Sequence, residues 1–273
     1  MKTRASRAIA TIAIGSHQDL LNLSIGNFLK FAEIHDYQPE ICYQSLDAAK
    51  PPAWTKLLFI LNLMEKYDEI FCVDSDAIIL DTSVDVLDEI DPSSEMAWVY
   101  HEYENQRHPN SGVMYIRVNE STRNLFSEAS LQYDLEKHPW WDQAALMRVM
   151  GIHTEDSEIK SGTNRNTIKI KEQELSLSWN SIRQNSASRP HIRHFAGEPF
   201  WIRKFLMAEY VNPGLNASAV LQDMITEFLQ LQSYQATIDL PVVSSQGKQE
   251  KISSKYTFLK LFKRIATGWS KIK

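Results

Sequence analysis

Cysteine and long apolar runs are what the 273-residue sequence has least of. Its two cysteines, Cys42 and Cys72, exclude a disulfide framework and favour a reducing compartment. No stretch approaches the roughly 18 consecutive apolar residues of a membrane-spanning helix. The formal net charge of −5 lacks the basic excess that a nucleic-acid polymer would attract. What is left is a globular chain whose 43% hydrophobic content is ordinary for a full core.

Strand and helix patterns alternate through the first third of the chain. Short apolar runs over 8–14, over 40–43 and up to Asp74 enclose two segments, 19–35 and 54–67, with helical spacing of apolar residues. We interpret 8–14 as a first strand rather than a signal peptide, because a polar stretch follows it without a small-residue cleavage pattern. The β-α-β-α-β order predicts an α/β fold with a mostly parallel sheet flanked by helices.

The second half of the sequence continues with further elements. We expect strands over 96–100, 113–117 and 192–195, and helices over 120–135, 141–150 and 216–235. The polar segment 155–173 is predicted to be a loop or a mobile flap. The apolar strand that contains Cys72 makes that thiol a small buried hydrophobe rather than a reactive group.

Two carboxylates, Asp74 and Asp76, stand one residue apart where an apolar strand ends. Open α/β sheets bind their ligands at the carboxyl ends of central strands, and period-two alternation would point both side chains the same way. Two converging carboxylates suit Mg²⁺ or Mn²⁺, which would also take oxygens from a substrate diphosphate. The alternative is a solvated Asp-Ser-Asp turn, since Asp and Ser are common turn formers.

Two segments beside this pair carry groups that could contact a ligand. Lys56, near the start of the predicted helix 54–67, could reach a phosphate or a sugar hydroxyl, or could simply be a solvated helix lysine. Asn110, Ser111 and Gly112 precede the predicted strand 113–117, where glycine would let the backbone approach a ligand and the polar side chains could bond hydroxyls. The alternative for these three is a simple turn at the start of the strand.

Two later segments could likewise bind a ligand or play a purely structural role. Asp142 and Gln143 open a predicted helix beside two tryptophans, as in a sugar site, although an acid in a first turn also serves as a helix cap. His194 ends a short predicted strand, where its imidazole could bind a metal or play a structural role.

Taken in order, these motifs resemble the GT-A-fold retaining glycosyltransferases over about residues 7–205. Two groups are similar: glycogenin with the bacterial lipopolysaccharide galactosyltransferases, and the yeast mannan transferases with the plant xyloglucan xylosyltransferases. The turn at Asp36 and the pair Trp179-Asn180 also look like theirs. The resemblance implies a GT-A (Rossmann-like) domain over 1–215 and a helical C-terminal extension over 216–273.

The resemblance also implies a role for each motif residue. Asp74, Asp76 and His194 match the metal ligands, with Mn²⁺ (or Mg²⁺) as the usual ion and a UDP-sugar as the usual donor. Asp142 and Gln143 match the pair beside the anomeric carbon. The residues that match the donor-binding segments are Lys56, Ser75, Asn110, Ser111, Gly112 and Gly197.

One departure from the pattern concerns the diphosphate. Glu198 stands where the glycogenin-like pattern has a lysine, so Arg203 or Lys204 would have to supply that contact. The expected activity is transfer of a hexose or pentose, with retention, to a glycan, lipid-linked or protein acceptor. Two alternatives are a catalytically degenerate sugar-binding or scaffold protein, and a haloacid dehalogenase-like phosphatase, whose Asp-x-Asp motif lies on a chain's first strand.

The last segment, residues 255–273, differs in composition from the rest. It contains five lysines and one arginine and no acidic residue. Apolar and aromatic residues lie between these charges. This composition is typical of a basic amphipathic helix on an anionic membrane surface, and the alternative is docking on the protein's own acidic surface. We therefore expect a cytoplasmic protein that is peripheral on the inner face of a membrane.

Overall fold

The structure is a computed structural model that describes residues 6–103, 106–160 and 167–212. The predicted helix 216–235, the rest of the predicted extension and the basic segment 255–273 lie outside the described residues. None of the helices within these described ranges has the length and apolar character needed to cross a bilayer.

The predicted β-α-β-α-β order is confirmed. The chain runs through β1 (Arg7–Ile12), α1 (His17–His35), β2 (Gln38–Cys42), α2 (Trp54–Met64) and β3 (Glu69–Val73). The inward positions of β1 and β3 are fully buried because both strands lie inside the sheet with helices on either face. Two-sided burial explains why their sequences read as continuous apolar runs.

The central sheet is mainly parallel, as predicted. Its order is β2-β1-β3-β6-β5-β7, where β5 is Met96–Tyr103, β6 is Gln106–Arg117 and β7 is Glu172–Glu174. β1 pairs in parallel with β2 and β3, and β6 is antiparallel to both β3 and β5. Since β7 is parallel to β5, β6 alone runs against the other strands of this described sheet.

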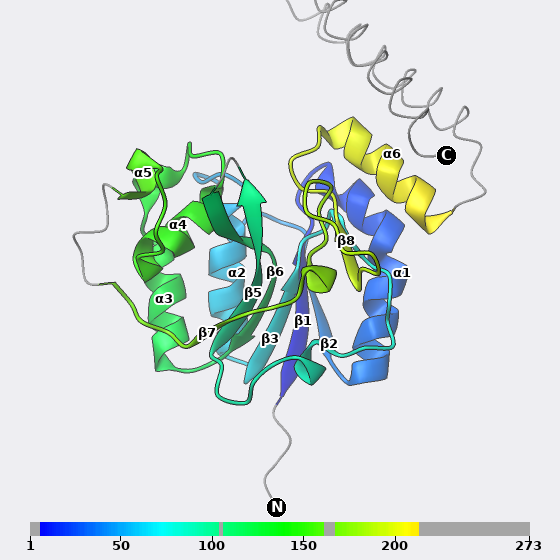
Figure 1. Cartoon of the computed structure of the whole chain (residues 1–273), viewed down its shortest axis with the longest axis horizontal. Helices are drawn as coiled ribbons and strands as arrows, with labels where there is room; N and C mark the ends of the chain where they lie inside the picture. The colour runs from blue at the N-terminus through cyan, green and yellow to red at the C-terminus, as the bar shows by residue number, and fades with distance from the viewer. Residues whose placement is uncertain (1–5, 104–105, 161–166, 213–273) are drawn as a thin grey trace, which may run out of the picture. The chain divides into compact units, whose positions relative to one another are not determined.

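Helices cover both faces of the sheet (Figure 1). On one face lie α2, α3 (Glu120–Ser130), α4 (Trp141–Met150) and the short α5 (Ser157–Lys160), over a core that includes Trp54, Trp98 and Met114. On the other face lie α1 and α6 (Phe200–Val211), with a second core around Phe71 and Trp179. A full core on each face fixes the sheet as a rigid platform.

A separate two-stranded ribbon follows the end of β3. Its strands are β4 (Ala77–Ile79) and β8 (Ile192–His194), which pair antiparallel with Ala77 opposite His194. Ile78 packs with Leu20, Phe195 and Met207 in a small cluster that joins this ribbon to α1 and α6. The ribbon therefore brings His194 next to Asp76, although 118 residues of sequence separate them.

The predicted bounds of the elements differ from the structure most at three places. The predicted loop 155–173 contains α5 and β7, because Ile159 is fully buried and Asp156 accepts backbone hydrogen bonds from Glu158 and Ile159. The predicted helix 120–135 ends at Ser130 and is followed by a 3₁₀ turn, Tyr133–Leu135. Residues 110–112 lie inside the long strand β6 rather than in a turn before it.

Candidate functional site

Asp74 and Asp76 lie in a tight turn between β3 and β4. The Ala77 amide donates to the Asp74 carbonyl at 3.0 Å, and the Asp74 amide donates to the Gly112 carbonyl of β6 at 2.8 Å. The predicted strand alternation is therefore wrong for this pair, and the backbone forms the Asp-Ser-Asp turn that was its alternative. The turn is not simply solvated, since Ser75 and Asp76 are buried.

The turn and the β4–β8 ribbon bring three side chains together. One ligand atom from each of Asp74, Asp76 and His194 lies within 4.8 Å of the others. His194 Nε2 is 3.3 Å from Asp76 Oδ1, and both side chains are buried, whereas Asp74 is 27% exposed. Two carboxylates and one imidazole are a donor set suited to a divalent ion such as Mn²⁺, and their spacing fits a single shared ion.

A chain of amide contacts orients the His194 ring. Asn180 Oδ1 lies 2.9 Å from His194 Nδ1, and Asn180 Nδ2 donates to Asn110 Oδ1 at 2.9 Å. Asn110 Oδ1 also accepts the Gly112 amide at 2.9 Å. Because Asn180 uses its amide protons on Asn110, its oxygen accepts the Nδ1 proton, and Nε2 is the ring nitrogen that faces Asp76 and would be the one to bind an ion.

Gly112 provides the space that the imidazole needs. A Cβ atom at this position would lie 2.1 Å from His194 Cε1 and 2.6 Å from Nδ1. The sequence indicated glycine for close approach of a ligand to the backbone, and the group that approaches it in the structure is the His194 side chain. Asn110 was predicted to line the sugar pocket. Its side-chain oxygen accepts hydrogen bonds from the Gly112 amide and from Asn180 in this same network.

Lys56 is buried between two carboxylates, so its alternative as a solvated helix lysine is wrong. Its Nζ lies 2.8 Å from Asp74 Oδ1 and 3.1 Å from Asp142 Oδ2, and it donates to the Ser111 carbonyl at 3.2 Å. Burial alone would lower the pKa of Lys56, but Asp142 and Asp74 outweigh it and the pKa is raised. The ammonium group therefore links the acidic turn to the start of α4.

Asp142 and Gln143 both face Ser111. The Ser111 hydroxyl donates to Asp142 Oδ2 at 2.8 Å, and the Ser111 amide donates to Gln143 Oε1 at 3.4 Å. Asp142 is buried and bonds to side chains, so it is more than a cap of the α4 terminus. Trp141, just before it, has a φ of 37°, an unusual backbone angle for a bulky residue that begins this helix.

Two further side chains contact the acidic turn, although no sequence motif placed them there. Arg203 Nη1, from α6, lies 2.9 Å from Asp76 Oδ2. His17 Nδ1, at the start of α1, lies 3.0 Å from the Ser75 hydroxyl. The sequence offered Arg203 as a diphosphate contact, but only the fold shows that the two side chains reach the turn.

These neighbours shift the two acids in opposite directions. Burial would raise the pKa of Asp76, but the His194 imidazole and the Arg203 guanidinium outweigh it and the pKa is lowered. For Asp74, burial raises the pKa and Asp76 adds to the rise, while Lys56 opposes it. The turn therefore holds two unequal carboxylates.

Gly197 and Glu198 follow the ribbon. Gly197 has a φ of 74°, which favours glycine, and open space where its side chain would be. Glu198 pairs with Arg183 at 3.1 Å, away from the three candidate ligands. The structure thus gives Glu198 a partner of its own.

Cys72, two residues before Asp74, is inert at neutral pH, since burial raises the pKa of its thiol to about 12.

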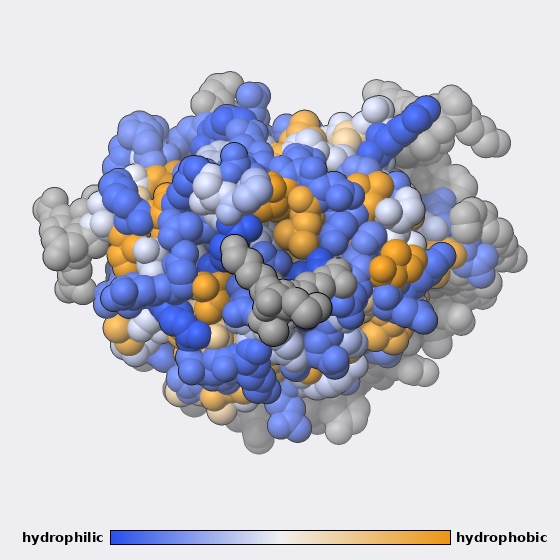
Figure 2. All heavy atoms as spheres, turned by 90° about the horizontal axis from the view of Figure 1, so that it is seen from below, coloured by the Kyte–Doolittle hydropathy of each residue, from blue (hydrophilic) through white to orange (hydrophobic). Residues whose placement is uncertain are grey.

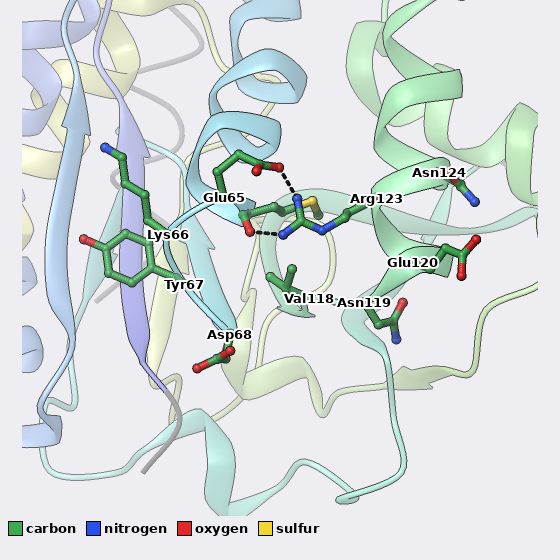
Figure 3. Close-up of a pocket in the computed structure, with 10 residues that line it drawn as sticks. Glu65, Lys66, Tyr67, Asp68, Val118, Asn119, Glu120, Arg123 and Asn124 are labelled. Carbon is green, nitrogen blue, oxygen red and sulfur yellow. Dashed lines mark hydrogen bonds and ion pairs between the residues drawn. The ribbon is translucent and has the colours of Figure 1, made fainter. Parts of the chain in front are cut away.

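A separate hollow of about 480 Å³ lies at the opposite end of the strands. It is lined by residues around Asp68 and Asn119, next to the beginning of β3 (Figure 3). Arg123 in its wall already pairs with Glu65 and the Met64 carbonyl. Because it lies where β3 begins, the hollow is separate from the acidic turn at the end of β3.

Hydrophilic side chains cover most of the molecule on this side, with apolar residues in scattered patches (Figure 2).

The sequence and the fold resemble those of known proteins. Residues 9–125 match the galactosyl transferase GMA12/MNN10 family. The resemblance to GT-A-fold glycosyltransferases is confirmed. This match spans Lys56, Asp74, Asp76 and the segment 110–112, and stops before α4 and the β8 strand. No curated protein matches the sequence.

Solved structures share the GT-A fold at low sequence identity. A glycosyltransferase involved in the glycosylation of the major capsid of PBCV-1 is 13% identical, with a TM-score of 0.51 over 73% of this chain and 98% of that one. The glycosyltransferase GlyE of Streptococcus pneumoniae TIGR4 is 14% identical, with a TM-score of 0.51 over 88% of this chain and 67% of that one. The family match and the shared fold together support glycosyl transfer as the activity.

Proposed function

We propose that the protein is a metal-dependent glycosyltransferase that moves a hexose or pentose from a UDP-sugar to a glycan, lipid-linked or protein acceptor, with retention. The observation that carries this proposal is the convergence of Asp74, Asp76 and His194 at the carboxyl end of β3. Lys56 and Ser111 connect this group to Asp142 and Gln143. A diphosphate site and a sugar site would then be adjacent.

The proposed donor would use both halves of this arrangement. Asp74, Asp76 and His194 would hold Mn²⁺ or Mg²⁺, which when bound supplies positive charge for the leaving diphosphate. Lys56 contacts both Asp74 and Asp142, and its charge opposes the rise in the pKa of Asp74. Ser75 and Gly197 are the remaining candidates for donor contacts beside this group.

The sugar half of the proposed site lies at the start of α4. In the transfer, the bond between the anomeric carbon and the β-phosphate oxygen breaks, and a bond from the acceptor oxygen to that carbon forms on the same face. The acceptor proton passes to the departing phosphate oxygen. We assign Gln143 to the anomeric carbon, where its amide oxygen would stabilise oxocarbenium character, and Asp142 to fixing Ser111 and Lys56 beside it.

Incubation with a panel of UDP-sugars and Mn²⁺ tests the activity. We expect slow UDP release, lost by at least 100-fold in Asp76→Asn and His194→Gln and retained in the control Glu128→Gln, an exposed acid of α3. Release of inorganic phosphate instead would favour the phosphatase alternative, and no release the scaffold alternative. For the stereochemistry, NMR of the product anomer should show retention, and an inverted product would contradict that part of the proposal.

A further inference from the structure

Arg203 is the one permanent cation within the described residues that contacts Asp76 through its side chain. Its Nη1 lies 2.9 Å from Asp76 Oδ2, and its Nη2 donates to the Glu198 carbonyl at 2.8 Å. The side chain is 16% exposed, and its buried Nε has no hydrogen-bond partner among the described residues. A guanidinium with an unused donor beside a candidate metal ligand is equipped to bind an anion.

The charges around the turn change sign when a divalent ion is added. Asp74, Asp76 and Asp142 face Lys56 and Arg203, which leaves one net negative charge. A divalent cation reverses this to one net positive charge and takes over the neutralisation of Asp76. Arg203 then no longer needs Asp76 as its partner, and its strongest available attraction is an anion bound beside the ion.

We propose that Arg203 binds the donor diphosphate, exchanging Asp76 for a phosphate oxygen when the divalent ion occupies the turn. This inference rests on the proposed function, because it takes the anion to be a sugar-nucleotide diphosphate. Arg203 contacts the Asp76 carboxylate in the free protein, so it competes with the ion for that group. The guanidinium fork matches two phosphate oxygens, which an ammonium group does not.

The neighbouring Lys204 is the other residue that the sequence offered for the diphosphate contact, and it supplies the matched comparison. It pairs with Asp19 of α1 at 3.0 Å, so it neutralises a carboxylate on another element. Glu198 is an acid that pairs with Arg183, so it cannot supply a positive charge to a diphosphate. Replacing Arg203 or Lys204 by Gln removes one positive charge from the same helix. The comparison of these two variants thus separates a specific contact from a general electrostatic effect.

Two binding measurements on the full chain test the proposal. The first is Mn²⁺ affinity without nucleotide, from the signal of free Mn²⁺ in electron paramagnetic resonance, for the wild type, Arg203→Gln, Arg203→Lys and Lys204→Gln. The second is calorimetric affinity for UDP and for inorganic pyrophosphate in saturating Mn²⁺. Circular dichroism melting confirms that each variant is folded, and Arg203→Lys provides a second variant that keeps the charge.

We expect Arg203→Gln to bind Mn²⁺ at least as tightly as the wild type and to bind UDP and pyrophosphate at least 10-fold more weakly. Arg203→Lys should lie between the two, and Lys204→Gln should change neither affinity by more than 2-fold. Unchanged pyrophosphate affinity in Arg203→Gln, an equal loss in Lys204→Gln, or a wild type that binds no diphosphate would overturn the inference. Pyrophosphate binding without UDP binding would instead contradict the UDP-sugar donor while leaving the role of Arg203 intact.

Discussion

At the scale of single residues, the site is defined by what each side chain must contact within the protein. His194 is aimed by Asn180, and Asn180 is aimed by Asn110. Lys56 lies between carboxylates that would otherwise repel one another. Residues that the sequence offered as direct ligand contacts therefore also hold the site together.

Gly112→Ala should displace the His194 ring, since the added methyl group would overlap its Cε1 and Nδ1 atoms. We expect Mn²⁺ affinity to fall at least 10-fold, measured by electron paramagnetic resonance. The control is Gly26→Ala in α1, where a Cβ meets nothing within 4 Å and should stabilise the helix by about 0.5–1 kcal/mol. Mn²⁺ affinity equal to that of the wild type in Gly112→Ala would contradict this explanation of the glycine.

Lys56→Met should leave Asp74 and Asp142 without their shared cation. Removing one partner of a buried ion pair costs about 3 kcal/mol of unfolding free energy at neutral pH. The pKa of Asp74 is already raised in the native state, so the folded protein binds more protons than the unfolded chain above about pH 4, and stability falls as pH rises through this range. The loss should therefore be larger at pH 8 than at pH 5 in urea unfolding.

Lys66→Met, just beyond α2 at an exposed position, is the control for this change. We expect it to alter the unfolding free energy by less than about 0.5 kcal/mol at either pH. A destabilisation of Lys56→Met that is the same at pH 5 and pH 8 would mean that lost packing, and not unpaired carboxylates, explains it.

At the scale of elements, the β4–β8 ribbon and α6 position the site. The ribbon sets Asp76 against His194, and α6 sets Arg203 against Asp76. One small apolar cluster, Leu20, Ile78, Phe195 and Met207, fastens both elements to α1. The placement of α6 thus depends on few buried side chains.

Met207→Ala should create a cavity in this cluster, because Met207 is fully buried. We expect a loss of about 3 kcal/mol in urea unfolding, together with a several-fold loss of pyrophosphate affinity in Mn²⁺ as Arg203 loses its support. Asn119→Ala removes the capping box of α3, far from the turn, and should cost about 1 kcal/mol without any change in that affinity. Equal losses of affinity in both variants would point to general destabilisation instead.

At the scale of the whole molecule, the two ends of the sheet differ in character. Charged groups and the three candidate metal ligands gather where β3 ends, while the opposite end carries the hollow near Asp68. The composition of residues 255–273 adds a third region, and we propose that its cations attach the protein to an anionic membrane surface.

Neutralising three of these cations in the full chain tests that attachment. Lys260→Gln, Lys263→Gln and Arg264→Gln together should weaken sedimentation with phosphatidylserine liposomes about 100-fold, at about 1 kcal/mol per charge, and raised salt should weaken the wild type likewise. The control replaces exposed Lys30, Lys66 and Lys137 by Gln. Equal losses in both triple variants would assign binding to net charge rather than to the segment.

Much of the fold, and the three side chains that converge as candidate metal ligands, could be predicted from the sequence. Strands buried on both faces read as short continuous apolar runs, and the helices between them show a period of 3.6 residues, so the order from β1 to β3 follows from local pattern. Asp74, Asp76 and His194 stood out because polar groups at the ends of apolar strands are costly unless used. The predicted bounds of helices and strands were wrong where contacts between residues distant in sequence decide them. One example is Ile159, which is buried although it lies in the predicted loop.

The sequence by itself determined that this chain forms an α/β sheet with acids at the end of a central strand, because those features depend on hydrophobic periodicity within each segment. Only the tertiary structure decided that Asp74 and Asp76 sit in a turn, that Asn180 orients His194, and that Arg203 of α6 neutralises Asp76. These contacts join elements that are separated by up to 127 residues of sequence. Their partners are set by how the sheet, the ribbon and α6 pack, which no local pattern records.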